Sequence, residues 1–280
     1  SSGVEGITLV EAGADTPITT GVEPLPIDEL PGPDDVSCVI YTSGSTGLPK
    51  GVMLHHGGLF HLVSVQAKLF DIRPDSRVLQ FSSPSFDASL LDISMALCHG
   101  ARLCLAPRAD LMPGDPLVRA LQNHRITHLT LPPSALAVLD QGVSFPSVKT
   151  LVVAGEVCPP AVTRRWAPRH RFINIYGPTE TTVFVTAEVC KAEYAGPTPI
   201  GRPIDGIPIY ILDDNLQPVA PGVRGELFVG GICVSRGYLN KPELTAQRFV
   251  EDPFSPERGA RMYKTGDIGR WLPDGSIEYI

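Results

Sequence analysis

The 280-residue chain lacks several features that would assign it to a common class of protein. It contains no apolar run of membrane-spanning length and no recognisable signal peptide, so we expect no membrane partner. Its formal net charge is −7, which argues against nucleic-acid binding because such proteins need a basic surface. No Cys-x-x-Cys pair or Cys/His ligand spacing is present, so a zinc site is not expected.

Cysteine is sparse and scattered along the chain. The six cysteines stand at positions 38, 98, 104, 158, 190 and 233, most of them inside apolar runs. Scattered thiols in apolar surroundings are typical of reduced, buried cysteines rather than of a disulfide framework. We therefore expect a cytoplasmic protein.

The composition is that of a folded protein, with 43% hydrophobic and 19% charged residues. The chain begins with Ser1-Ser2-Gly3 instead of Met, and Ile280 lies inside an apolar, strand-like run. We expect this sequence to be a fragment of a longer polypeptide.

Three regions differ in their sequence pattern. Residues 1–35 are rich in Gly, Pro and acids and are interpreted as a connector, the remnant of a preceding core subdomain. In residues 36–190 short apolar runs alternate with helical patterns, which predicts an α/β subdomain with a mainly parallel sheet layered with helices. Residues 191–280 have many Gly and Pro and several strand patterns, and predict a smaller antiparallel β subdomain.

One Gly-, Ser- and Thr-rich segment, YTSGSTGLPKGV at 41–52, is suited to binding phosphate. Its glycines let the backbone approach a ligand, its hydroxyls and N–H groups are donors, and Lys50 adds a positive charge. The apolar run 36–41 before it predicts a buried strand. Composition alone leaves an ordinary polar loop as an equal alternative. Lys50 is followed by Gly51 rather than Ser or Thr, which disfavours a P-loop NTPase.

Two further clusters carry acidic residues next to glycine turns. In NIYGPTETT (174–182) a strand ends at Tyr176, and a Gly-Pro turn presents Thr179 and Glu180. The Glu180 carboxylate would suit Mg²⁺. A helix N-cap at Thr179 is the simpler interpretation of this cluster taken alone. In YKTGD (263–267) Asp267 is suited to accept hydrogen bonds from both ribose hydroxyls, although an Asp in a β-turn is very common.

The order of these motifs is more informative than any one of them. YTSGSTGLPKGV, FDAS at 86–89, NIYGPTETT, GELFVGGICVSRGYLNKPELTAQRF and YKTGD closely resemble the motifs of adenylate-forming enzymes. More narrowly, the chain resembles the adenylation domain of a nonribosomal peptide synthetase over residues 36–280. The resemblance implies a partial N-terminal core of that fold.

The resemblance also implies an activity and a set of site residues. Such domains use ATP and Mg²⁺ to convert a carboxylic acid into an acyl-AMP, and then load it onto the phosphopantetheine of a peptidyl carrier domain that works beside a condensation domain. Lys50, Thr179 and Glu180 would be catalytic, with Glu180 as the metal ligand. The phosphate loop would be Thr42, Ser43, Gly44, Ser45, Thr46 and Gly47, and the adenine and ribose contacts Gly155, Asn174, Ile175, Tyr176, Asp267 and Tyr279.

Asp87 narrows the expected substrate. In relatives that activate amino acids, an Asp at this position pairs with the α-ammonium group, and a buried carboxylate needs such a partner. A helix N-cap is the local alternative. The side-chain pocket implied by the resemblance is apolar apart from one threonine, and its residues are Ala88, Leu91, Thr130, Val152, Ala154, Ile175, Val183 and Phe184. A hydrophobic amino acid is therefore expected.

Two departures from the family pattern bear on activity. Relative to the family pattern, we expect this fragment to lack the C-terminal lid subdomain with its Lys and the first part of the N-terminal core, and therefore not to be the complete catalyst on its own. An acyl- or aryl-CoA ligase of the same superfamily and an inactive nucleotide-binding fragment remain as alternatives.

Overall fold

The computed structural model describes residues 30–43, 48–194 and 196–280. The chain divides into two compact units, 1–31 and 32–280, and the account below concerns the second. Most of the expected connector 1–35 and the loop residues Gly44, Ser45, Thr46 and Gly47 lie outside the described residues.

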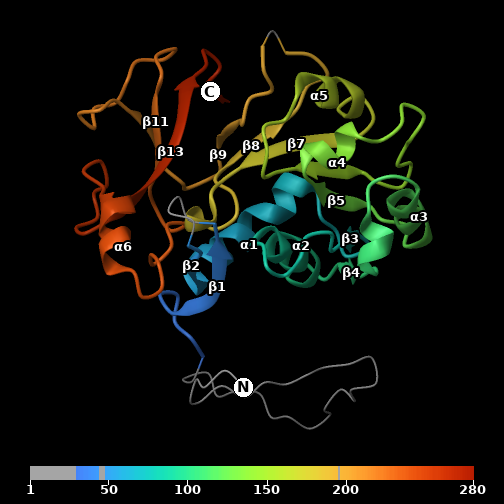
Figure 1. Cartoon of the computed structure of the whole chain (residues 1–280), viewed down its shortest axis with the longest axis horizontal. Helices are drawn as coiled ribbons and strands as arrows, with labels where there is room; N and C mark the ends of the chain where they lie inside the picture. The colour runs from blue at the N-terminus through green and yellow to red at the C-terminus, as the bar shows by residue number, and fades with distance from the viewer. Residues whose placement is uncertain (1–29, 44–47, 195) are drawn as a thin grey trace. The chain divides into compact units, whose positions relative to one another are not determined.

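The central element is a large sheet with strand order β4-β3-β5-β6-β7-β8-β9 (Figure 1). Its strands from β4 to β7 run parallel, while β8 and β9 add to it in antiparallel fashion. In sequence order these strands are β3 (Arg77–Leu79), β4 (Arg102–Cys104), β5 (His128–Leu131), β6 (Thr150–Val153), β7 (Arg171–Tyr176), β8 (Thr186–Val189) and β9 (Arg202–Pro203). The predicted mainly parallel α/β sheet is confirmed.

Helices cover both faces of the large sheet because its central strands are apolar on both sides. In β6, Leu151 and Val153 pack into one core cluster and Val152 into the other, as the two-residue period of a strand requires. Helices α1 (His56–Phe70) and α2 (Ala88–Leu97) pack on the Val152 side. On the opposite side lie α3 (Asp115–Asn123), α4 (Pro133–Ala137) and α5 (Pro160–Trp166). A short 3₁₀ turn, η2 (Arg108–Leu111), precedes α3.

A smaller antiparallel sheet forms the expected β subdomain. Its strands are β10 (Ile209–Leu212), β11 (Gly225–Val229), β12 (Phe249–Glu251), β13 (Arg261–Trp271) and β14 (Ile277–Tyr279), with α6 (Pro242–Arg248) before β12. The long strand β13 pairs with β11, β12 and β14. The two sheets are linked by a bridge between Gly201 and Ile277, so the C-terminal strand lies next to the end of the large sheet. The exact division at residue 190 stays a prediction.

The segment around the phosphate loop differs from expectation. The run before the loop forms β1 (Val36–Thr42), but in this strand only Ile40 is buried, so the predicted buried strand is wrong. It pairs antiparallel with β2 (Lys50–His55), a strand the sequence pattern did not predict. The phosphate loop therefore lies between the two strands of an antiparallel pair.

Candidate functional site

The expected catalytic residues Lys50 and Glu180 meet although they are 130 residues apart. Lys50 stands at the start of β2, and Glu180 in a 3₁₀ turn, η3 (Thr179–Thr181). Lys50 Nζ donates to Glu180 Oε1 at 2.6 Å and to the Tyr238 hydroxyl at 3.0 Å, and Tyr238 OH donates to the same Oε1 at 2.7 Å. The ammonium also lies 4.5 Å from the centre of the Tyr238 ring. The result is a closed triangle of charge-assisted hydrogen bonds.

Burial makes the electrostatics of this triangle strong. The side chain of Glu180 is 6% exposed and that of Lys50 17%. Burial opposes ionisation of both groups, but their hydrogen bonds to each other and to Tyr238 lower the pKa of Glu180 and raise that of Lys50. Both groups are therefore held charged at neutral pH.

The donor set of Glu180 fits the implied Mg²⁺. The ion takes oxygen ligands and is commonly held by one or two carboxylates together with substrate phosphates. Among the described residues no group of three or more His, Cys, Asp or Glu forms a ready metal site. A single carboxylate beside the Lys50 ammonium thus suits an ion that arrives with the nucleotide.

The turn that carries Thr179 and Glu180 has a strained backbone. Thr182 and Val183 both have positive φ, 59° and 72°, which is unfavourable for β-branched residues. The Thr182 hydroxyl holds this conformation by donating to the carbonyl of Cys233 at 2.8 Å. Pro178, not Thr179, is the N-cap of η3, so the helix-cap interpretation of Thr179 is wrong.

Gly177 is required by close packing of the same turn. A Cβ placed there would lie 2.5 Å from the Cα of Phe184 and 2.9 Å from the carbonyl oxygen of Val183. Any side chain would force the turn away from these atoms. The close contact between the backbone at Gly177 and the backbone at Val183 and Phe184 thus helps to fix the position of Thr179 and Glu180.

The expected adenine and ribose residues gather around one cavity of about 280 Å³. Asp267 accepts hydrogen bonds from Tyr176 OH at 2.6 Å and from Tyr279 OH at 3.0 Å. Burial, reinforced by the Asp267 charge, raises the pKa of both tyrosines, so both stay protonated donors. Asp267 lies within β13, so the simple β-turn interpretation is wrong. All six predicted residues line this cavity: Gly155, Asn174, Ile175, Tyr176, Asp267 and Tyr279.

Asp87 opens into a neighbouring cavity of about 450 Å³, here called the acyl cavity. Asp87 occupies the N-cap position of α2, as the local alternative expected, but its side chain makes no capping hydrogen bond. Burial raises the pKa of Asp87, Glu180 adds to that rise, and a hydrogen bond from Thr179 opposes it. No Lys or Arg pairs with Asp87 among the described residues. A cationic ligand would supply the missing charge.

The two cavities share part of their walls. Gly155, Glu156 and Gly177 line both of them. These residues, like Asp87, follow the carboxyl ends of the parallel strands, where ligands bind in open α/β sheets. A nucleotide in one cavity and an acid in the other would therefore lie side by side.

The acyl cavity matches only part of the expected side-chain pocket. Ala88, Leu91, Thr130, Ala154 and Val183 line it, together with residues that were not predicted for the side-chain pocket. Val152 and Phe184 do not line it: both are buried in the core, with the Phe184 ring 5.7 Å from that of Phe70. Ile175 lines the nucleotide cavity instead. The lining residues not predicted are Phe81, Ser82, Ser83, Phe86, Leu131, Pro132, Gly155, Glu156 and Gly177.

The phosphate loop is described only at its ends. The Thr42 hydroxyl is buried without a hydrogen-bond partner among the described residues, and Ser43 is exposed. Lys50 leads from the loop into the triangle with Glu180.

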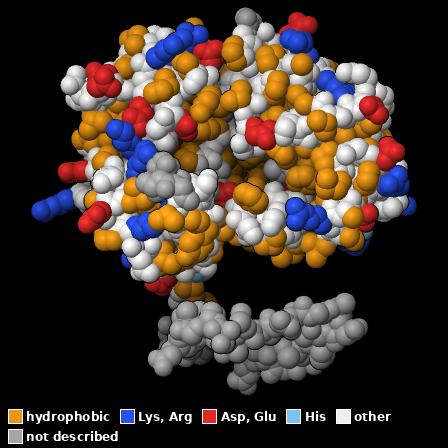
Figure 2. Space-filling model, viewed as in Figure 1, with side chains coloured by type: hydrophobic (Ala, Val, Ile, Leu, Met, Phe, Trp, Pro, Cys, Tyr) orange, Lys and Arg blue, Asp and Glu red, His pale blue; other side chains and the backbone are white. Residues whose placement is uncertain are grey.

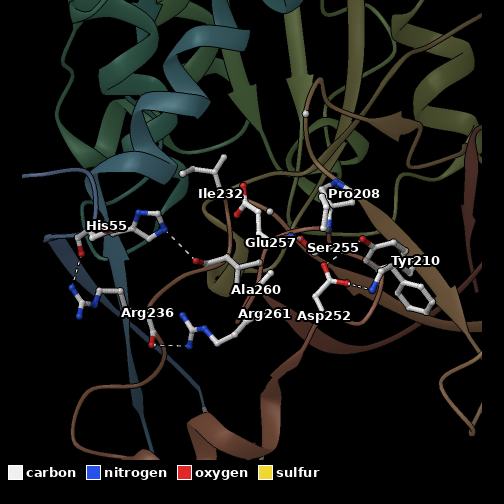
Figure 3. Close-up of a pocket in the computed structure, with 16 residues that line it drawn as sticks. His55, Pro208, Tyr210, Ile232, Arg236, Asp252, Ser255, Glu257, Ala260 and Arg261 are labelled. Atoms are coloured by element: carbon white, nitrogen blue, oxygen red, sulfur yellow. Dashed lines mark hydrogen bonds between the residues drawn. The ribbon is translucent and has the colours of Figure 1, made fainter.

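A larger cavity, of about 870 Å³, is lined by none of the predicted site residues (its lining is drawn in Figure 3). Three of its charged side chains bond to the protein itself. Arg236 donates to the carbonyl of Asp34 at 2.6 Å, Arg261 to that of Ser235 at 3.1 Å, and Asp252 accepts from Phe254 N at 3.0 Å. These three side chains are therefore not free to bind a ligand.

In the view of Figure 2, Lys and Arg side chains lie scattered among Asp and Glu instead of forming a basic patch. In the described part of the chain, no helix combines the length and the apolar character needed to span a bilayer.

Comparison with known proteins identifies the family. A model of AMP-binding enzymes matches residues 5–239, more than half of the chain. The chain belongs to the AMP-binding enzyme family. Similar curated proteins include bacitracin synthase 3 of Bacillus licheniformis, 48% identical over 246 residues, which covers 88% of this chain and 4% of that protein. Novobiocin biosynthesis protein H of Streptomyces niveus is 46% identical over 288 residues, or 98% of this chain and 46% of that protein.

A solved structure agrees with this AMP-binding assignment. The nonribosomal peptide synthetase FmoA3, in a form bound to α-methyl-L-serine-AMP, matches with a TM-score of 0.80 and 34% identity over 89% of this chain and 29% of that one. The resemblance to synthetase adenylation domains is thus confirmed, and with it an AMP-forming ligase family. The chain spans less than half the length of the relatives named here.

Sequence reasoning missed Tyr238, which the fold places in the candidate site. It stands in the segment RGYLN, whose sequence by itself does not suggest a catalytic or binding role. Its hydroxyl reaches Glu180, and it also lies 3.4 Å from the hydroxyl of Tyr263. Only the fold, which brings this segment beside β2 through the Val52–Tyr238 bridge, reveals its place.

Proposed function

We propose that the chain activates an α-amino acid with an uncharged, mainly apolar side chain as its aminoacyl-adenylate, releasing pyrophosphate from ATP. One observation carries this proposal. The carboxylate of Asp87, which no described cation pairs, opens into the acyl cavity, and that cavity shares its wall with the cavity around Asp267. This is the arrangement needed to hold an ammonium-bearing acid beside a nucleotide.

The reaction joins two anions, and the site supports it by positioning and charge. An oxygen of the substrate carboxylate attacks the α-phosphorus of ATP, and the bond from that phosphorus to the bridging oxygen breaks, leaving pyrophosphate. Lys50 would neutralise phosphate charge, and Thr179 would donate a hydrogen bond to the α-phosphate. Glu180 would hold Mg²⁺, which supplies charge neutralisation when bound. No protein nucleophile is needed.

Nucleotide recognition would use Asp267 and its two tyrosines. The Asp267 carboxylate would accept hydrogen bonds from both ribose hydroxyls, while Tyr176 and Tyr279 fix its orientation. The Tyr176 ring, at the end of β7, would stack on adenine. The predicted phosphate loop from Thr42 to Gly47 would bind the β- and γ-phosphates.

Selectivity for amino acids would come from Asp87. A buried carboxylate is costly unless it is paired, and an α-ammonium group supplies a partner that aryl and fatty acids lack. Ala88, Leu91, Ala154 and Val183 give the acyl cavity an apolar wall. Charged side chains would lose their hydration there without compensation.

The activated acid would then be transferred to a carrier. We propose that the thiol of a phosphopantetheine arm on a carrier domain attacks the acyl carbon and releases AMP, and that a condensation domain uses the thioester. Names of relatives such as bacitracin synthase 3 support this route. A cytoplasmic location remains a prediction.

The test is ATP–pyrophosphate exchange by the full-length polypeptide that carries this chain. We expect exchange to depend on one or a few uncharged amino acids out of the standard twenty. Exchange supported only by free fatty or aryl acids would instead assign an acyl- or aryl-CoA ligase. No exchange and no calorimetric binding of Mg-ATP would assign an inactive nucleotide-binding fragment.

A further inference from the structure

Tyr238 is bonded to both charged members of the triangle. Its hydroxyl accepts a hydrogen bond from Lys50 Nζ at 3.0 Å and donates one to Glu180 Oε1 at 2.7 Å. Lys50 Nζ itself donates to the same Oε1 at 2.6 Å. Both of these bonds to the Glu180 carboxylate therefore end on one oxygen, and neither uses the other oxygen, Oε2.

The fold holds the Tyr238 ring in one place. Tyr238 is buried, and its ring packs edge-on against that of Phe249, with 5.4 Å between the ring centres. Its backbone N–H donates to the Thr245 hydroxyl at 2.9 Å. The bridge to Val52 ties the same residue to β2, the strand that carries Lys50. A hydroxyl on so firmly packed a ring can serve as a fixed point for the longer side chains that bond to it.

The Tyr238 hydroxyl remains a donor at neutral pH. Burial raises the pKa of Tyr238, although the hydrogen bond from Lys50 opposes this rise. An ammonium group can only donate and a carboxylate can only accept, so the chemistry of the three groups settles the direction of each bond. The phenol directs its proton to Glu180 Oε1 and its oxygen lone pair to the Lys50 ammonium.

We propose that Tyr238 is a positioning residue for metal-dependent nucleotide binding: its hydroxyl keeps one oxygen of Glu180 engaged and leaves Oε2 to bind the Mg²⁺ that accompanies ATP. Carboxylates that bind metals are commonly held in this way by an outer hydrogen bond. The inference rests on the proposed function. It deepens that function by assigning the metal dependence of ATP binding to a residue that acts through Glu180.

The hydroxyl matters most once a nucleotide is bound. Lys50 would then turn toward the phosphates and weaken its bond to Glu180, so the Tyr238 hydroxyl would be the neutral partner that remains on Oε1. Unlike an ammonium group, a hydroxyl does not repel the metal ion. Without it the carboxylate would rotate freely, and the entropy lost on fixing it again would weaken metal binding.

The test compares Tyr238→Phe with the wild type in the full-length polypeptide that carries this chain. Phenylalanine keeps the ring, and with it the contact of the Lys50 ammonium 4.5 Å from the ring centre. Calorimetry measures the affinity for ATP once with Mg²⁺ and once with EDTA, and the ratio of the two affinities gives the metal dependence. We expect Tyr238→Phe to lower this ratio at least about tenfold, as loss of an outer partner of a metal ligand typically does.

Tyr176→Phe is the matched control. It too removes a tyrosine hydroxyl that donates to a carboxylate of the site, in this case Asp267 at 2.6 Å. Asp267 would hold the ribose and not the metal, so this change should weaken ATP binding alike with Mg²⁺ and with EDTA. We therefore expect Tyr176→Phe to keep the ratio within about twofold of wild type.

Other results would overturn the inference. An unchanged ratio in Tyr238→Phe would show that Glu180 binds the metal without this partner. An equal fall of the ratio in Tyr176→Phe, or a Tyr238→Phe protein that no longer unfolds cooperatively in urea, would leave the hydroxyl only a structural role.

Failure of the proposed function is distinguishable from failure of this inference. Pyrophosphate exchange that does not depend on amino acids would refute amino-acid activation, while the ratio of ATP affinities would still decide the role of Tyr238. A wild type that binds ATP equally well with Mg²⁺ and with EDTA would refute the role of Tyr238 alone. A wild type that does not bind ATP at all would refute both proposals.

Discussion

We expect the triangle of Lys50, Glu180 and Tyr238 to contribute both to stability and to the proposed nucleotide binding. Replacement of Glu180 by Gln keeps the shape of the side chain and removes its charge. The Lys50 ammonium then retains only neutral partners, at a position where its side chain is 17% exposed. Glu180→Gln therefore tests the Lys50–Glu180 ion pair with little effect on packing.

The expected loss of stability follows from this burial. Removal of one partner from a buried ion pair typically costs about 3–5 kcal/mol. Lys50 keeps its contact with the Tyr238 hydroxyl and ring and some access to water, so the lower end applies. We expect Glu180→Gln to reduce the free energy of unfolding by about 3 kcal/mol, roughly a hundredfold in the folding equilibrium. Urea denaturation of the 280-residue chain at pH 7 measures this difference.

A double variant separates the two contributions. In Lys50→Met/Glu180→Gln no charge is left unpaired, so most of the lost stability should return. Binding of Mg-ATP, measured by calorimetry, should not return, because both the cation for phosphate and the carboxylate for Mg²⁺ are gone. The reasoning would be refuted by a Glu180→Gln variant as stable as wild type, or by a double variant that binds Mg-ATP normally.

Three other predictions concern single residues. Burial raises the pKa of Asp92 to about 7 from the 3.8 of an exposed carboxyl, so the native state binds one proton more than the unfolded state and stability falls as pH rises between these values. Relative to wild type, the free energy of unfolding of Asp92→Asn should therefore increase by about 4 kcal/mol between pH 4 and pH 8, measured by urea denaturation. Parallel pH curves for the two proteins would contradict this. Gly177→Ala should destabilise the chain by about 2 kcal/mol or more, because its Cβ meets the backbone of Phe184 at 2.5 Å; an unchanged thermal midpoint would show that the turn relaxes freely. Asp267→Asn should weaken Mg-ATP binding about tenfold or more through loss of a charged acceptor for the ribose, which calorimetry checks; wild-type affinity would remove Asp267 from the nucleotide site.

Periodic apolar patterns predicted most elements of the large sheet and its helices. The runs around His128–Leu131, Thr150–Val153 and Arg171–Tyr176 are buried on both faces, so their strands are clear from composition alone. The elements that were missed lack this signal. Strand β2 follows directly on the phosphate loop, and β9 has only two residues, so their pairing depends on tertiary contacts.

The candidate site was predicted best for the residues that line the nucleotide cavity. Gly155, Tyr176 and Asp267 reach this one cavity as expected. Predictions failed where strand or turn geometry decides which way a side chain points. Phe184 follows Val183, whose positive φ turns the chain, so Val183 faces the cavity while Phe184 packs into the core.

Long-range contacts account for the candidate-site residue that the sequence did not predict. Tyr238 has no sequence signal for function, because its position beside Glu180 depends on the bridge to β2. It could be found only once the fold brought distant segments together.

The most direct test of the central claim compares an amino acid with its analogue that lacks the α-ammonium group, for example phenylalanine with 3-phenylpropionate, in wild type and Asp87→Ala. The proposed pairing predicts that wild type prefers the amino acid by about 10² to 10³ in kcat/KM for exchange, the value of a buried ion pair, and that Asp87→Ala loses this preference while Mg-ATP binding is nearly unchanged. Equal use of both acids by wild type, or full preference in Asp87→Ala, would contradict amino-acid activation through Asp87.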